Sequence, residues 1–471
     1  MTVSIYSPSD GSLIAERELA SDEYVSDVLA NAYDAQKHWQ QVPISERAEY
    51  CHKAIAWFVE QQDEIAEEIS QLMGRPIQYA KGEISGLKER ADYMIGIAQA
   101  ALSDTVINPD DQEFTRIIRP TALGTAFIIA PWNYPYLTAI NSIIPALMAG
   151  NCVILKHASQ TLLCAERFQQ AFKSAGLPSG VFQHLHLSHA QTLATIQTDD
   201  INYVSFTGSV NAGKVIEKNL AGCFKPLALE LGGKDAAYVR ADADLSTVVP
   251  NLVDGSFFNS GQSCCGIERI YVAADIFESF VSQFVAETKK LILGHALNPA
   301  TSLGPMINNN AINHAQSQID QALLLGAKAH IQEQDFTIAQ GPSQNQDVGQ
   351  GNFMQPQILT HVNHEMDIMS EESFAPIIGI MAVDNDKQGI EMINDSEFGL
   401  SASIWSHDEK TCLALCDDIN TGTVFINRCD YLDPSLPWVG IKDSGRGCSL
   451  SHLAYQQLTR PKSIHLKKHQ R

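Results

Sequence analysis

The chain has 471 residues, and its 32 Lys+Arg against 54 Asp+Glu give a formal net charge of −22. Apolar residues make up 45% and charged residues 18% of it, which is the composition of a globular protein and not of a disordered one. The acidic balance argues against a nucleic-acid partner, because phosphate binding needs a basic surface.

Ten cysteines are spread along the chain without a CxxC pair, so neither a zinc site nor a disulfide framework is indicated. The first 23 residues lack the basic and apolar segments of a signal peptide. Residues 121–155 carry no charge, but Pro131, Pro135 and Pro145 interrupt them, so we expect a buried strand–loop–helix–strand and no membrane contact. These features predict a reduced, cytoplasmic protein.

Residues 22–100 are predicted to be helical, because apolar residues such as Ile55, Phe58 and Ile65 recur at helical spacing. Gly74 and Pro76 mark a stop near the end of this run. The next periodic segment, 114–122, alternates as a strand does. The N-terminal hundred residues should therefore form a helical layer that ends in a strand.

Short apolar runs follow at 125–131, 151–157, 203–209 and 227–233, with helical segments at 136–150, 159–175 and 210–222 between them. This alternation predicts βαβ units around a parallel, doubly wound sheet that could bind a nucleotide. A second α/β unit is expected from about residue 233, with a surface loop at 333–352 and a basic tail that contains a short strand.

The segment GSVNAGKV (208–215) fits the first seven positions of a P-loop, but Val215 stands where a Mg²⁺-binding Ser or Thr is needed. An ATPase is therefore disfavoured, and a glycine-rich turn suited to phosphate remains. In FNSGQSCCGIER (258–269), a cysteine beside small residues is a candidate nucleophile, although most cysteines are buried and inert. On the residues alone, Cys264 and Cys265 are equal candidates.

Three further motifs have both a chemical and a structural interpretation. Glu230 ends an apolar strand in ELGGKD, where a raised pKa would suit a base. Asn133 lies between two prolines, where its amide could hold an oxyanion. His184 and His186 alternate on one strand face, but no further ligand accompanies them, so no metal site is predicted.

Taken in order, PWN, Lys156, FTGS, ELGGK, GQSC, EESFAP and PWVGIKDSGRG resemble the motif series of the aldehyde dehydrogenase superfamily over essentially the whole chain. The resemblance implies an α/β fold with two doubly wound parallel-sheet domains and a small β oligomerisation arm. It places the dinucleotide-binding domain at 1–103 and 123–231, the catalytic domain at 232–443 and the arm at 104–122 and 444–471. It also implies a homodimer or homotetramer.

By the same resemblance, Cys264 is the nucleophile that attacks the aldehyde, Asn133 stabilises the oxyanion, and Glu230 activates the water that hydrolyses the thioester. The cofactor is NADP or NAD. The residues expected to contact it are Ile129, Ala130, Pro131, Trp132, Lys156, Ser159, Gly208, Ser209, Leu231, Gly232, Glu372 and Phe374. Ser159 replaces a glutamate common in NAD-preferring members, which leaves room for a 2′-phosphate and favours NADP.

The substrate is a small aldehyde whose identity the motifs leave open, with succinate semialdehyde, betaine aldehyde and aliphatic aldehydes as candidates. The expected pocket lining is Tyr134, Thr138, Asn141, Ser263, Cys265, Tyr431 and Leu432, with no arginine cluster among them. Two alternatives stay open: a CoA-acylating enzyme, which Glu230 disfavours, and a catalytically retired binding protein, which the joint presence of Asn133, Glu230 and Cys264 disfavours.

Overall fold

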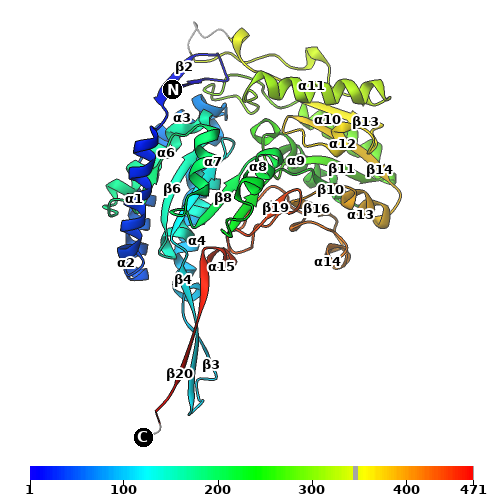
Figure 1. The fold of residues 1–471 in the computed structure, drawn as a ribbon. Helices are drawn as coiled ribbons and strands as arrows, with labels where there is room; N and C mark the ends of the chain where they lie inside the picture. Colours follow the sequence, from blue (N-terminus) through cyan, green and yellow to red (C-terminus); the bar gives the residue numbers. More distant parts are fainter. Residues whose placement is uncertain (343–347, 470–471) are drawn as a thin grey trace.

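The computed structural model describes residues 1–342 and 348–469, which form two α/β bodies side by side with a narrow β arm projecting from them (Figure 1). A six-stranded sheet of order β19-β9-β8-β5-β6-β7 forms the first body, and a seven-stranded sheet of order β12-β13-β14-β11-β10-β16-β17 forms the second. Most neighbouring strands in both sheets run parallel. The predicted α/β fold with parallel sheets is confirmed.

The first body begins with four long helices, each of which buries an apolar stripe, as the periodicity predicted. They are α1 (Asp22–Trp39), α2 (Ile44–Glu60), α3 (Gln62–Met73) and α4 (Ile77–Ala101). The Ser21 hydroxyl accepts the Tyr24 N–H at 3.1 Å, which caps α1. Gly74, at a φ of 84°, ends α3, and Pro76 begins α4.

Buried, uninterrupted apolar runs form the centre of the first sheet, as expected for parallel strands covered on both faces. Its elements are β5 (Thr125–Ala130), α5 (Pro135–Met148), β6 (Cys152–His157), η1 (Ser159–Thr161), α6 (Leu162–Ser174), β7 (Phe182–His184), α7 (His189–Gln197), β8 (Tyr203–Thr207), α8 (Val210–Leu220), β9 (Leu227–Glu230) and β19 (Gly445–Arg446). The uncharged stretch 121–155 is thus strand, loop, helix and strand. β7 ends at His184, so His186 lies beyond the strand in which we expected it.

The second sheet contains the strands predicted after residue 233. Its elements are β10 (Asp235–Val239), α9 (Leu245–Phe257), η2 (Phe258–Gly261), β11 (Ile267–Ala273), η3 (Ala274–Ile276), α10 (Phe277–Thr288), α11 (Asn309–Leu324), β12 (Lys328–Ala329), β13 (Gln357–Thr360), α12 (Asp367–Ser370), β14 (Ile377–Val383), α13 (Asp386–Asn394), β16 (Ser401–Trp405), α14 (Glu409–Cys416) and β17 (Thr423–Ile426). The predicted loop at 333–352 contains the short turns η4 (Glu333–Asp335) and η5 (Val348–Gln350), and its residues 343–347 lie outside the described part.

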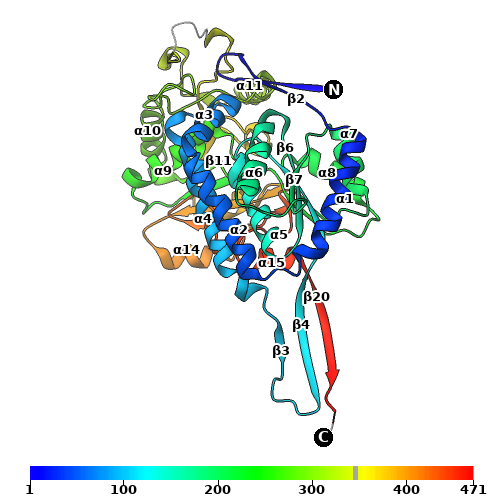
Figure 2. The same cartoon turned by 90° about the vertical axis from the view of Figure 1, so that its left-hand side faces the viewer.

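A three-stranded antiparallel sheet forms the arm, in which β4 (Phe114–Ala122) pairs with β3 (Thr105–Ile107) and with β20 (Thr459–Lys467) (Figures 1 and 2). Not all of the segment expected in the arm lies there. β19 extends the first sheet, and α15 (Leu453–Gln457) packs in the first core, because Ala454 and Tyr455 are buried. Two small pairs complete the fold: β1 (Thr2–Tyr6) with β2 (Leu13–Glu18), and β15 (Phe398–Gly399) with β18 (Ile441–Lys442).

Within 1–342 and 348–469, none of the helices combines the length and the apolar composition needed to cross a bilayer. The same residues hold no group of three or more His, Cys, Asp and Glu side chains placed to bind a metal ion.

Candidate active site

The predicted cofactor residues of the first body lie at one edge of its sheet. Ile129 and Ala130 end β5, and Ile129 stands beside Lys156 of β6. The neighbouring strands β8 and β9 lead into Gly208 and Ser209 and into Leu231 and Gly232, while the loops after β5 and β6 carry Pro131, Trp132 and Ser159. This carboxyl edge is where doubly wound sheets bind nucleotides.

The charges at this edge fit a phosphorylated dinucleotide. Lys156 is 5% exposed, and it has no ion-pair partner among the described residues. Burial lowers the pKa of Lys156, because a desolvated ammonium is unfavourable without an anion. Ser209 caps α8, whose N-terminus points free N–H groups and a positive dipole end at this edge.

Glu372 and Phe374, from the second body, contact residues at this edge of the first sheet. Glu372 Oε1 accepts the Gly233 N–H at 3.0 Å, and the rings of Phe374 and Trp132 meet edge to face with centroids 5.7 Å apart. Burial first, and the nearby Glu268 second, raise the pKa of Glu372 to about 7. Glu372 therefore lies next to Gly232 and Gly233, and Phe374 lies beside Trp132.

A buried ion pair that the sequence analysis missed holds this segment. Lys234 Nζ lies 2.7 Å from Glu268 Oε2, with both side chains nearly inaccessible. The two Glu268 oxygens also accept the N–H groups of Ser373 and Phe374, each at 2.8 Å. Lys234 follows the ELGG motif directly, so a buried charge pair here positions Glu372 relative to Glu230.

Cys264 lies in the loop between η2 and β11. The three residues before this loop, Asn259, Ser260 and Gly261, have φ values of 54°, 59° and 69°. Such a left-handed run is unusual, and contacts with the surrounding structure must offset its conformational cost. A Cβ on Gly233 would lie 2.7 Å from the Cys264 carbonyl oxygen. The glycine turn after Glu230 is therefore packed directly on the backbone of Cys264.

The two adjacent cysteines differ in their surroundings. Cys264 is half-buried and lines a cavity, whereas Cys265 is 3% exposed and its Sγ donates to Asp430 Oδ1 at 2.9 Å. The pKa of the Cys265 thiol is well above its usual value, first because of the hydrogen bond with Cys264, then through burial and the Asp430 carboxyl. A thiol held protonated is a poor nucleophile, so this geometry favours Cys264.

Glu230 and Asn133 approach the cysteine loop from the first body. Glu230 Oε2 accepts the Thr207 hydroxyl at 3.2 Å, and burial raises the pKa of Glu230. Asn133 Nδ2 donates to the Gln262 carbonyl at 3.2 Å, which leaves its second amide hydrogen for a substrate oxygen. Asn133 thus contacts the loop that carries Cys264, and Glu230 lies three residues before Gly233, which packs on the Cys264 carbonyl.

A cavity of about 440 Å³ opens beside Cys264. Six of the seven predicted pocket residues line it: Tyr134, Thr138, Ser263, Cys265, Tyr431 and Leu432. The seventh, Asn141, is outside the lining and buried, and its Oδ1 accepts from Arg90 at 3.4 Å. Asn141 lies one helical turn beyond Thr138 on α5, so it contacts Arg90, which lines the cavity, and does not reach the cavity itself.

Two arginines that the sequence analysis did not single out also line the cavity. Arg75 is paired with the buried Glu83 and stacks on the Tyr134 ring at 4.4 Å. Arg90 donates to the Leu137 carbonyl at 3.0 Å and forms no ion pair with any described residue. Burial lowers the pKa of Arg90, and Glu83, Cys265, Glu230 and Cys264 oppose that shift. The cavity therefore holds one unpaired cation close to the cysteines and Glu230.

Comparisons with known proteins agree with this site. The pattern described as "Aldehyde dehydrogenase family" matches residues 1–464. The Escherichia coli (strain K12) protein named succinate semialdehyde dehydrogenase [NAD(P)+] Sad is 30% identical over 96% of this chain and 95% of its own. Succinate-semialdehyde dehydrogenase [NADP(+)] 1 of Mycobacterium tuberculosis (strain ATCC 25618 / H37Rv) is 30% identical over 98% of this chain and 99% of its own.

Among solved structures, succinic semialdehyde dehydrogenase from Streptococcus pyogenes, in complex with NADP+, superposes with a TM-score of 0.92 at 27% identity. The match covers 99% of this chain and 100% of that one. The chain belongs to the aldehyde dehydrogenase family. The family, the fold class and the enzyme class predicted from the motifs are confirmed.

Proposed function

We propose that this protein oxidises an aldehyde to its carboxylic acid with NADP+ or NAD+, using Cys264 as nucleophile, Asn133 as oxyanion donor and Glu230 as base. The observation that carries the proposal is the packing of the Gly232–Gly233 turn on the Cys264 backbone. This packing supports the proposal, because it connects the end of β9, which carries Glu230, with the loop that carries Cys264.

In the proposed reaction, the Cys264 thiolate adds to the aldehyde carbonyl, and the Asn133 amide and the Cys264 N–H stabilise the resulting oxyanion. The bound nicotinamide cofactor supplies the chemistry that accepts the hydride, which leaves a thioester on Cys264. Glu230 then takes a proton from water, the water oxygen attacks the thioester, and the acid leaves as the thiol is restored. The raised pKa of Glu230 suits a base that works near neutral pH.

The substrate we propose is a short aldehyde that also carries a carboxylate, such as succinate semialdehyde. Arg90 supports this choice, because a half-buried guanidinium without a counter-ion among the described residues favours an anionic ligand. The semialdehyde named for the bacterial relatives is consistent with it. Lys156 and the absence of a carboxylate at Ser159 support NADP+ as an accepted cofactor.

Assembly and location are proposals of the same kind. The arm exposes Val106, Ile107, Ile118 and Leu466, which suits a homodimer or homotetramer. Ten unpaired cysteines suit the reducing cytoplasm.

One panel tests the reaction and the substrate together. Succinate semialdehyde, butanal and 4-aminobutanal are compared by kcat/KM with each cofactor, following reduced cofactor, with and without CoA. We expect the anionic aldehyde to be preferred and succinate, not an acyl-CoA, to be formed. No reduced cofactor with any aldehyde would contradict the reaction, and preference for the neutral or cationic aldehyde would contradict the substrate class.

A further inference from the structure

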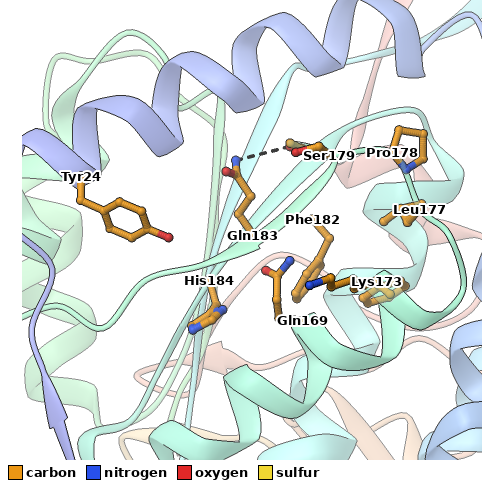
Figure 3. Close-up of a pocket in the computed structure, with 11 residues that line it drawn as sticks. Tyr24, Gln169, Lys173, Leu177, Pro178, Ser179, Phe182, Gln183 and His184 are labelled. Atoms are coloured by element: carbon orange, nitrogen blue, oxygen red, sulfur yellow. Dashed lines mark hydrogen bonds between the residues drawn. The ribbon is translucent and has the colours of Figure 1, made fainter.

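A positively charged side chain lines each of the two cavities of about 440 Å³. In the groove between α1, α6 and β7, Lys173 is exposed, and none of the residues that line the cavity at Cys264 lies there (Figure 3). In the cavity at Cys264, Arg75 is 2% exposed, and each of its three guanidinium nitrogens donates to a different partner. These partners connect Arg75 with the loop that carries Asn133.

Arg75 holds the backbone of Asn133. Its Nη2 donates to the Asn133 carbonyl at 2.6 Å, and the guanidinium lies 4.4 Å from the centre of the Tyr134 ring. A hydrogen bond from a charged donor is stronger than one from a neutral donor. Asn133 is therefore fixed through its main chain, while one amide hydrogen of its side chain remains for a substrate oxygen.

Glu83 holds the other end of this loop, where α5 begins. Its Oε2 pairs with Arg75, and its Oε1 accepts the N–H groups of Tyr136 and Leu137, each at 2.9 Å. Tyr134, the residue before α5, supplies no side-chain cap, so the Glu83 carboxylate takes that role from α4. The buried pair of Arg75 and Glu83 thus fixes the loop at both ends.

The third donor of Arg75 reaches the segment before Cys264. Arg75 Nε donates to Asn259 Oδ1 at 3.3 Å, and Asn259 Nδ2 donates to the Gln262 carbonyl at 3.1 Å. The same carbonyl accepts the side-chain amide of Asn133 at 3.2 Å. Arg75 therefore acts on both the loop of Asn133 and the loop of Cys264, and it sets the position of one relative to the other.

We propose that Arg75 is a positioning residue, which places the Asn133 amide where the oxyanion forms on the Cys264 adduct. Each guanidinium nitrogen already donates to a protein group, so Arg75 holds the loop and leaves the substrate carboxylate to Arg90. A displacement of about 1 Å at a reacting group can cost about a hundredfold in rate. The proposal rests on the oxyanion role of Asn133 in the proposed function.

Arg75→Lys tests this role, because an ammonium keeps the charge beside Glu83 but cannot reach three separate partners. The rate of the first equivalent of reduced cofactor is measured by stopped-flow with succinate semialdehyde and with butanal, which carries no charge. With both aldehydes we expect this rate to fall about tenfold to a hundredfold in the otherwise wild-type protein, but less than about threefold in an Asn133→Ala background. A residue that only stabilises the fold would cost the same in both backgrounds.

Two measurements show whether the rest of the site stays intact. The KM for cofactor should not change, because Arg75 lies away from the dinucleotide edge. Alkylation of Cys264 by iodoacetamide, followed by mass spectrometry, should not change either, because alkylation forms no oxyanion. Arg240→Lys, the same substitution in an ion pair with Asp386 directly after β10, is the matched control and should leave the rate unchanged.

Glu83→Asp is the second variant if Arg75→Lys does not fold. It keeps the charge pair but shortens the side chain by one methylene, so it should give the same loss and the same dependence on Asn133. The proposal is overturned by rates that both variants leave intact, by equal losses in the two backgrounds, or by a loss confined to succinate semialdehyde, which would mean that Arg75 binds the substrate carboxylate. Wild-type rates in Asn133→Ala would contradict the proposed function itself, and this proposal with it.

Discussion

The Cys265 thiol donates to the Asp430 carboxyl at 2.9 Å, whereas Cys264, one residue earlier, has no carboxylate partner among the described residues. Asp430 is itself half-buried among the cavity residues, and desolvation of its carboxyl raises its pKa to about 7. A hydrogen bond from Cys265 to this carboxyl fixes one thiol in place and leaves Cys264 as the thiol available to a ligand.

Replacing each cysteine separately should distinguish their roles. We expect Cys264→Ala to lower kcat/KM on the order of a thousandfold or more, as loss of a nucleophile does, while Cys265→Ala stays within about tenfold. Rates of cofactor reduction are measured beside cofactor binding by fluorescence, which should persist in both variants. An inactive Cys265→Ala beside an active Cys264→Ala would reverse the assignment.

Glu230→Gln should separate acylation from hydrolysis. The amide cannot accept the proton of water, so we expect one rapid equivalent of reduced cofactor per site in stopped-flow, followed by turnover below about one per cent of wild type. Because burial raises the pKa of Glu230, wild-type hydrolysis should rise with pH as this carboxyl ionises. Glu409→Gln, at an exposed position of α14, serves as control. A normal steady state in Glu230→Gln would show that another group activates the water.

The affinity for cofactor should depend on pH through Glu372. Its pKa is raised to about 7, so the side chain is neutral well below that pH and a carboxylate above it. The carboxylate is the stronger acceptor for ribose hydroxyls, so the KM for cofactor should fall between about pH 6 and pH 8. Glu372→Gln should abolish this trend. Because Asp430 also titrates near pH 7, Asp430→Asn is the control, and it should retain the trend.

Cofactor preference should depend on residue 159. Ser159→Glu places a carboxylate near the ribose, where it repels a 2′-phosphate and accepts the 2′-hydroxyl of NAD+. We expect the ratio of kcat/KM for NADP+ over NAD+ to fall about tenfold or more, while Ser159→Ala leaves it nearly unchanged. A strong wild-type preference for NAD+ would contradict the role assigned to Lys156 and Ser159.

Arg90→Gln should discriminate between aldehydes by charge. Losing a charge-assisted hydrogen bond should raise the KM for succinate semialdehyde about tenfold to a hundredfold, and the KM for butanal should change little. Lys88→Gln, on the exposed side of the same helix, is the matched control. Equal losses for both aldehydes would indicate that Arg90 only supports the local structure.

Four strands of the first sheet, β5, β6, β8 and β9, were predictable, because buried parallel strands are continuous apolar runs and these four coincide with such runs. The loop that carries Cys264 and the end of β9 that carries Glu230 were predictable from their motifs. Arg75, in the turn between α3 and α4, and Glu83 and Arg90, on α4, were not, because they lie far from the motifs in sequence. Glu83 did carry a local signal: it is a charged residue within the apolar stripe of Ala80, Ile84 and Leu87.

The bounds of the predicted arm in the sequence were harder to predict, because neighbouring segments differ only in which other parts of the fold they contact. Residues 445–446 join the first sheet through backbone hydrogen bonds with β9. Backbone pairing leaves no recognisable pattern of side chains in the sequence. The buried Tyr455 donates its hydroxyl to the Met94 carbonyl at 2.6 Å, and this contact across distant segments places α15 on the helical layer. Tertiary contacts of this kind cannot be found from periodicity alone.

The pairing of β4 with β20 has a consequence for the order in which the molecule can form. Thr121 and Arg460, which are bonded across this ladder, are separated by 339 positions. During synthesis, the edge of β4 that pairs with β20 therefore stays without hydrogen-bond partners until both α/β bodies have been made. Unpaired strand edges of this kind promote aggregation. In the proposed oligomer, subunits can associate through a finished arm only after this late strand has docked.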